Sequence, residues 1–106
     1  MSRYRVVLVT CPPEAEEKIA RALVEERLAA CVNAIPNVTS TYRWEGKIER
    51  DGETLLVIKT ETGRLDALAE RVRALHPYDV PEVIALPIEA GSLDYLRWLS
   101  ESVAPE

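Results

Sequence analysis

An apolar stripe at helical spacing lies between two strand-like runs in the second half of the sequence, and this pattern constrains the fold most. Its members, at i, i+3, i+4, i+7 and i+10, are Leu65, Leu68, Ala69, Val72 and Leu75. The stripe predicts an amphipathic helix that residues 63–64 open and His76-Pro77 ends. The flanking runs, residues 54–60 and 83–86, are apolar and rich in β-branched residues. Strand, helix and strand in this order predict a β-α-β unit.

The first half of the chain repeats this order. Residues 4–10 predict a short strand, and Pro13 then stands in the first turn of a helix, where its missing N–H costs nothing. We expect that helix over about residues 13–28. A long strand should follow over residues 31–44, with a break near Pro36-Asn37. The order β-α-β-β-α-β, completed by a last helix, predicts an α+β fold: a ferredoxin-like sandwich with helices on one face of an antiparallel sheet.

Further details of this sandwich follow from the same patterns. Residues 55–58 are apolar on both faces, so their strand is expected at the centre of the sheet. Gly46 or Gly52 could close the hairpin before it, and residues 50–53 are a turn candidate. Ser92 is expected to cap the last helix. The inner face of that helix should come from Leu93, Leu96, and Leu99 or Val103.

Composition and charge exclude several classes of protein. The 106 residues fit a single domain over residues 1–106. The net charge of −5, without a run of Lys or Arg, argues against nucleic-acid binding, because phosphates attract basic surfaces. No apolar run approaches the roughly 18 residues of a membrane helix, and the N-terminal residues lack a signal-peptide pattern. We therefore expect a cytoplasmic protein with neither nucleic-acid nor membrane partners.

The two cysteines are not spaced as a zinc site. Cys31 lies in the apolar run 29–32, which predicts a buried thiol that packs as a small hydrophobe. Cys11 stands between Thr10 and Pro12, after the first predicted strand, and we expect it to be the more exposed of the two.

Five motifs follow one another along nearly the whole chain. They are Leu28-Ala29-Ala30-Cys31-Val32-Asn33 with Ile35-Pro36, Ser40-x-Tyr42-x-Trp44-x-Gly46, Lys59-Thr60, His76-Pro77-Tyr78-x-Val80-Pro81-Glu82, and Tyr95-Leu96-x-Trp98-Leu99. In this order and spacing, the sequence resembles the CutA family, the divalent-cation tolerance proteins. The second and fourth motifs are specific together, whereas either alone would be a weak signal.

The resemblance implies a ferredoxin-like fold and a tight homotrimer, in which long β-hairpins pair across subunits, in an architecture similar to that of the PII signalling proteins. It also implies a role in tolerance to divalent metals, copper especially, and some members are described as binding copper. No enzymatic activity is established for the family. It implies no required cofactor, and a copper ion is the one candidate.

Two features depart from the pattern of some family members. A second His directly before the His-Pro-Tyr segment is replaced here by Leu75. A Cys near the end of the first strand is also missing, since Cys11 comes after the predicted strand. A copper site built from those ligands would be incomplete in this chain.

We expect one cleft at each subunit interface, lined by seven residues: Cys31, Tyr42, Trp44, Lys59, His76, Tyr78 and Glu82. His76, the only histidine, is the candidate metal ligand, and it needs a partner because one imidazole alone makes a weak site. Tyr42 and Trp44 share one face of a strand and could form an aromatic wall of the cleft.

Each of these residues also has a structural interpretation. His76 could interact with carbonyl groups at the end of a helix, and Cys31 could simply pack in the core. The aromatic residues could be core or subunit contacts. Lys59 could form a structural bridge to Glu61 or Glu82, or receive an anionic ligand.

Three functions are therefore compared. The first is a trimeric binding or signalling protein of metal-ion tolerance, with a metal ion or small ligand in the cleft. The second is an unrecognised enzyme that uses His76 as general base with Glu82 or Lys59 as its partner. The third is a structural trimer in which the aromatic residues only seal the interface. The sequence contains neither a nucleophile elbow nor a phosphate-binding loop, so no catalytic residue is assigned beyond the second hypothesis.

Overall fold

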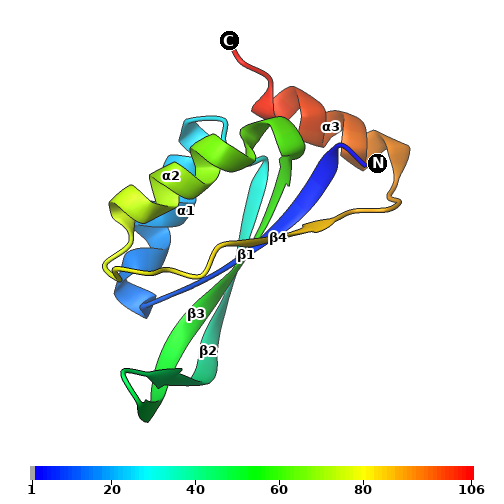
Figure 1. Cartoon of the computed structure of the whole chain (residues 1–106). Helices are drawn as coiled ribbons and strands as arrows, with labels where there is room; N and C mark the ends of the chain where they lie inside the picture. Colours follow the sequence, from blue (N-terminus) through cyan, green and yellow to red (C-terminus); the bar gives the residue numbers. More distant parts are fainter. Residues whose placement is uncertain (1) are drawn as a thin grey trace.

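The computed structural model describes residues 2–106 as a four-stranded sheet with helices on both sides (Figure 1). The strands are β1 (Tyr4–Cys11), β2 (Cys31–Trp44), β3 (Lys47–Glu61) and β4 (Ile84–Pro87), all antiparallel in the order β2-β3-β1-β4. The helices are α1 (Glu16–Glu25), α2 (Leu65–Leu75) and α3 (Leu93–Val103). This order confirms the predicted α+β, ferredoxin-like fold, with β3 in the interior of the sheet.

Helices α1 and α2 cover one face of the sheet and form the core. Each begins with a 3-10 turn, Pro13–Ala15 before α1 and Thr62–Arg64 before α2. Side chains at alternate positions of β1 and β3 meet the apolar stripes of the two helices, because strand side chains alternate between faces. The fully buried members are Val7, Val9, Leu56, Ile58, Ile19, Leu23, Leu68 and Val72. The stripe predicted for the second helix is therefore confirmed.

Helix α3 lies on the other side of the sheet (Figure 1). Leu99 and Val103 are buried there against Ala30 and Tyr4. Ser92 caps the helix as predicted, since its Oγ accepts a hydrogen bond from the Tyr95 N–H at 3.3 Å. Leu93 does not belong to the inner face: it is 77% exposed, because it lies at the very start of the helix, beyond the edge of the contact.

Strands β2 and β3 form a long hairpin that projects beyond the helices (Figure 1). Its turn is Glu45-Gly46, with φ angles of 50° and 81°, so Gly46 closes the hairpin. Two positive φ values are typical of the tight hairpin turn whose twist matches the strands. The prediction of a turn over residues 50–53 is wrong, because Gly52 pairs with Thr39 and Glu53 pairs with Val38 inside the ladder.

A β-bulge interrupts this ladder. Ile35 pairs with Leu55 and Val38 with Glu53, so Pro36 and Asn37 together oppose Thr54. Asn37 has a φ of 62°, a left-handed conformation that asparagine tolerates better than most residues. This irregularity confirms the break predicted near Pro36-Asn37.

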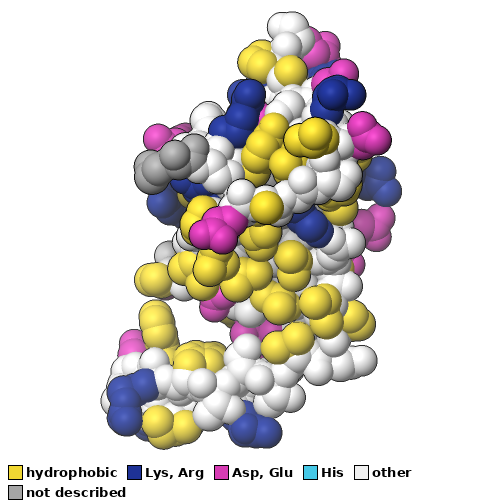
Figure 2. Space-filling view, turned by 90° about the vertical axis from the view of Figure 1, so that its right-hand side faces the viewer, with side chains coloured by type: hydrophobic (Ala, Val, Ile, Leu, Met, Phe, Trp, Pro, Cys, Tyr) yellow, Lys and Arg dark blue, Asp and Glu magenta, His cyan; other side chains and the backbone are white. Residues whose placement is uncertain are grey.

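The sheet face opposite α1 and α2 is largely uncovered between α3 and the hairpin tip. We call it the open sheet face; its apolar members are Val6, Leu8, Ile35, Leu55, Val57, Ile84 and Leu86. Ile84 and Leu86 are 52% and 47% exposed. Figure 2 shows hydrophobic side chains gathered across the middle of the molecule on the side that carries β4 and α3. An uncovered sheet face is normally polar, so this one is typical of an interaction surface.

The burial of the two cysteines is the reverse of the prediction. Cys11 is the last residue of β1, pairs with Thr54 and is 0% exposed. It follows Val7 and Val9 at period two, and therefore points into the helical core. Cys31 begins β2 and is only half-buried. Cys11 therefore lies at the end of β1, and not after it as the sequence predicted.

Thiol reactivity should reflect this arrangement. Burial, with a contribution from nearby Glu16, raises the pKa of Cys11 to about 11. The thiolate is the reactive form, so Cys11 is expected to be inert in the folded protein. A disulfide reagent applied at neutral pH should modify one thiol per native chain and two after denaturation. Cys31→Ser should abolish the native reaction, whereas a reaction that persists in this variant would contradict the burial of Cys11.

In the part of the chain that the structure describes, no helix is long and apolar enough to cross a membrane.

Candidate functional site

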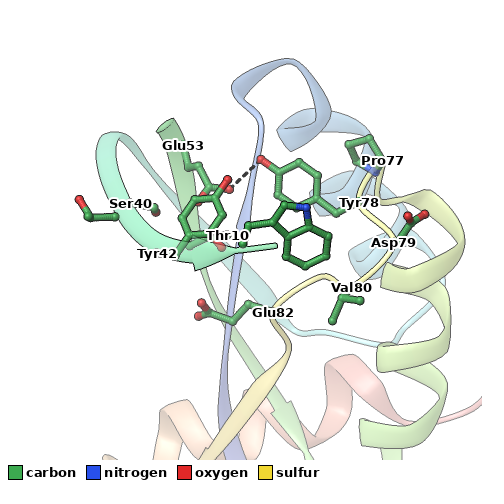
Figure 3. A pocket seen from close by; sticks show the side chains of 11 residues that line it. Thr10, Ser40, Tyr42, Glu53, Pro77, Tyr78, Asp79, Val80 and Glu82 are labelled. Atoms are coloured by element: carbon green, nitrogen blue, oxygen red, sulfur yellow. Dashed lines mark hydrogen bonds between the residues drawn. The ribbon is translucent and has the colours of Figure 1, made fainter. Parts of the chain in front are cut away.

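A pocket of about 610 Å³ lies between the outer half of the β2–β3 hairpin and the loop that follows α2 (Figure 3). The hairpin supplies one wall, and the proline-rich loop over residues 77–82 supplies the other. The lining residues are Thr10, Ser40, Thr41, Tyr42, Trp44, Glu53, Pro77, Tyr78, Asp79, Val80 and Glu82. The pocket is therefore built by segments far apart in the sequence.

Aromatic and acidic side chains dominate the pocket. The Tyr78 hydroxyl donates to Glu53 Oε2 at 3.1 Å (Figure 3). The Tyr42 hydroxyl donates to Asp51 on the neighbouring strand. Burial, together with the hydrogen bond to Glu53, raises the pKa of Tyr78 to about 12. The hydrogen bond to Asp51 is the main cause that raises the pKa of Tyr42 to about 12. Both phenols are held in the neutral, donating form.

These pKa values predict the alkaline behaviour of the protein. A phenol whose pKa is raised from 10 to about 12 stabilises the fold fully below pH 10 and loses that contribution as the pH rises towards about 12. In an ultraviolet titration of phenolate, Tyr42 and Tyr78 are expected to ionise near pH 12. Tyr78→Phe should remove one of these late transitions. Ionisation of both residues near pH 10 in the folded protein would contradict the hydrogen bonds described above.

His76 lies beside the pocket without lining it. The residue is 7% exposed, and its ring centroid is 4.6 Å from that of Tyr78. Nδ1 accepts a hydrogen bond from the Tyr78 N–H at 3.1 Å, so Nε2 carries the proton that is donated to the Thr10 carbonyl at 2.8 Å. Both ring nitrogens are occupied. His76 therefore fixes the loop against β1, and this geometry leaves no nitrogen for a metal ion or for general-base catalysis.

Cys31 and Lys59 form a second group on the open sheet face. The Cys31 thiol donates weakly to Asn33 Oδ1 at 3.8 Å, and Lys59 Nζ donates to the same oxygen. The bridge considered between Lys59 and Glu61 is not formed, because Glu61 pairs with Arg3 at 3.0 Å. Burial, with Cys31 nearby, raises the pKa of Tyr95 on α3. This group lies towards α3, away from the hairpin tip.

The structure thus divides the seven predicted cleft residues. Tyr42, Trp44, Tyr78 and Glu82 line the pocket together, and His76 supports it from outside. Cys31 and Lys59 do not reach it: Cys31 and Tyr42 lie near opposite ends of β2, about 35 Å apart if the strand ran straight. Within one chain, the predicted cleft does not converge on one point.

Glu53 is the important lining residue that the sequence interpretation missed. It is only 4% exposed, although it lies in a segment interpreted as a turn. One signal was available: Glu53 directly precedes the most apolar strand segment, and a carboxylate at such a position needs a partner.

The residues present do not fit a metal centre within one chain. Residues 2–106 contain no group of three or more His, Cys, Asp or Glu side chains placed to hold a metal ion. The buried His76 and the separated thiols explain this result. A copper site would need ligands from more than one copy of the chain.

Comparisons with known proteins agree with the sequence resemblance. A family model described as CutA1 divalent ion tolerance protein matches residues 5–102. The divalent-cation tolerance protein CutA of Thermus thermophilus is 57% identical over 98 residues, which cover 92% of this chain and 95% of that protein. Protein CutA of Homo sapiens is 57% identical over 88% of this chain, which spans about half (52%) of the human protein's length. The crystal structure of CutA1 from Oryza sativa superimposes with a TM-score of 0.94 at 52% identity, covering 99% of this chain and 97% of that one.

Proposed function

The chain belongs to the CutA1 divalent ion tolerance family, and on that premise we propose that it acts in divalent-cation tolerance as a trimeric binding protein. The names of the family and of the Thermus thermophilus relative describe tolerance, and neither names a catalysed reaction. The observation that carries the proposal is an acidic and aromatic pocket beside an apolar sheet face that this chain leaves uncovered.

The open sheet face supports the assembly. Val6, Leu8 and Val57 are half-buried within one chain, and Ile84 and Leu86 are about half exposed. Contact with further copies would remove this apolar surface from water, and this would stabilise the assembly by about 25 cal/mol for each Å² buried. A subunit count of three is what the family resemblance implies.

A second copy also offers a way to complete the cleft. The pocket and the group around Cys31 lie at separate places on the same sheet face. In an assembly, the pocket of one chain can lie next to the Cys31 and Lys59 of its neighbour. The proposed cation site is therefore a property of the assembly, in agreement with the missing metal cluster within residues 2–106 of one chain.

Calorimetric titration tests this function. Cu(II) is added to the assembled protein and, in parallel, to a variant that remains a single chain, Ile84→Glu with Leu86→Glu. Stoichiometric binding by the assembly alone is expected. Cys31→Ser should weaken that binding, whereas the buried Cys11→Ser should not. Absence of binding in the assembly, or equal binding by the single chain, would overturn an inter-subunit metal site.

The two rival functions are less well supported. General-base catalysis by His76 would require an exposed and free ring nitrogen, and both nitrogens are engaged. If the aromatic residues only sealed an interface, no pocket would be expected beside them, yet Tyr42 and Trp44 line a pocket within one chain.

The cytoplasm remains our prediction for the compartment.

A further inference from the structure

We propose that the pocket binds an organic cation that donates hydrogen bonds, a guanidinium or primary ammonium group. This inference rests on the proposed function. It names the class of ligand that binds in the pocket, which forms one half of the proposed cleft. The argument uses the charge, the aromatic walls and the size of the pocket.

The lining carries negative charge without compensation. Three of the eleven lining residues are acidic, Glu53, Asp79 and Glu82, and none is Lys or Arg. Figure 3 shows these carboxylates distributed around the aromatic rings, from the hairpin wall and from the opposite loop. Such an arrangement attracts cations and repels anions.

The position of Glu53 makes this negative charge destabilising for the folded chain. Glu53 is 4% exposed, and its Oε2 accepts a hydrogen bond from the neutral Tyr78 hydroxyl. None of the ion pairs among residues 2–106 involves Glu53. Buried carboxylates are normally paired with a cation, because an uncompensated buried charge is strongly destabilising. The pocket therefore contains an anion without the partner that such an anion usually has.

The aromatic rings specify what kind of cation fits. Tyr42, Trp44 and Tyr78 contribute to the same pocket, and the negative face of an aromatic ring attracts organic cations. A planar guanidinium stacks on such rings and donates paired hydrogen bonds to a carboxylate, whereas a quaternary ammonium donates none. Carboxylates next to aromatic faces thus favour a donating cation.

The size of the pocket and the spacing of its ligands argue against a bare metal ion in this half of the cleft. A volume of about 610 Å³ is in the range that holds small molecules. The acidic residues are not grouped in threes that could hold a metal. A metal ion needs several ligands in one tight shell, while an extended organic cation can contact separated carboxylates.

The test uses methylguanidinium as probe and methylurea, which has nearly the same shape without the charge, as its control. Titration is followed by calorimetry and by the indole N–H resonance of Trp44. Methylguanidinium is expected to bind at least about tenfold more tightly than methylurea. Glu53→Gln keeps the acceptor for Tyr78 and removes the charge, and it should weaken methylguanidinium binding at least about tenfold. Glu70→Gln, the same change on the exposed surface of α2, should leave the binding unchanged.

Two sources of the same cation are distinguished by the assembly state. A free small molecule is supported if methylguanidinium binds both the assembly and the Ile84→Glu/Leu86→Glu single chain. Binding by the single chain alone shows that a basic side chain of a second copy occupies the pocket in the assembly. Trp44→Leu should weaken the binding in either case, because the aromatic face is lost.

The inference is overturned if methylurea binds as well as methylguanidinium, or if neither assembly state binds the charged probe. It is also overturned if Glu53→Gln and Glu70→Gln behave alike. Each result is independent of the Cu(II) titration, because copper binding depends on Cys31 and on assembly. Failure of the organic-cation pocket and failure of the metal site are thus separate outcomes.

Discussion

Replacing His76 by alanine is expected to lower the free energy of unfolding by about 2–3 kcal/mol, as measured by urea denaturation. The imidazole is 7% exposed and joins two segments through the Thr10 carbonyl and the Tyr78 N–H. Truncation removes both hydrogen bonds, leaves a cavity beside the Tyr78 ring and releases the loop that forms one wall of the pocket. Loss of binding in this variant would therefore follow from loss of structure.

Two further substitutions separate the bonds. His76→Asn can still accept a hydrogen bond at the position of Nδ1, and His76→Gln can still donate from near the position of Nε2. Each is expected to recover part of the stability that alanine loses. If His76 were instead an exposed ligand, the free energy of unfolding of the alanine variant would lie within about 0.5 kcal/mol of that of the parent. The structural role assigned to this residue would then be wrong.

The Ile84→Glu/Leu86→Glu double variant is expected to dissociate the proposed assembly. Both side chains lie on the exposed edge strand β4 and point to the open sheet face. The free energy needed to bury two carboxylates in an apolar contact is far larger than the stabilisation that the contact provides, so the chains should separate. Sedimentation should change from about three times the 11.9 kDa of one chain to 11.9 kDa. The single chain should remain folded, because both positions are solvent-exposed within it.

Leu93→Glu is the matched control for this experiment. Leu93 is 77% exposed, but it begins α3 and does not belong to the open sheet face. The same chemical change there should leave the assembly intact. A parent protein that sediments as a single chain, or a double variant that sediments like the parent, would contradict the proposed interface.

Periodicity was sufficient to predict the fold. The helical stripe with Leu68 and Val72, and the alternation through Val7 and Val9, depend on geometric rules that hold for any buried helix or strand. Four of the residues that the motifs name, Tyr42, Trp44, Tyr78 and Glu82, line one pocket. What periodicity lacks is the orientation of a side chain at the end of an element. The sequence therefore predicted an exposed Cys11, although the strand extends one residue further and carries this residue into the core.

The candidate site was harder to predict because it depends on pairing between distant segments. Glu53 becomes a pocket residue only because β3 continues through residues 50–53 and because the loop after α2 folds back to place Tyr78 against it. His76 was predicted as a candidate ligand, but its two ring nitrogens form hydrogen bonds that connect β1 to the loop. Local sequence can indicate that a carboxylate such as Glu53 needs a partner, but it does not identify the distant partner in either contact.

The bulge at Pro36-Asn37 determines which side of the molecule the hairpin presents. Up to Ile35, the odd-numbered residues of β2 share the face of Lys59 and Leu55, and after the extra residue the even-numbered ones, Ser40 and Tyr42, take over that face. If the ladder continued without the bulge, Asn37 would pair with Glu53, and the residues after it would exchange their two surfaces, because a shift of one residue inverts the alternation. The whole set of aromatic residues in the arm would then turn away from Tyr78 and Glu53. A backbone irregularity without any chemistry of its own thus decides whether the pocket exists.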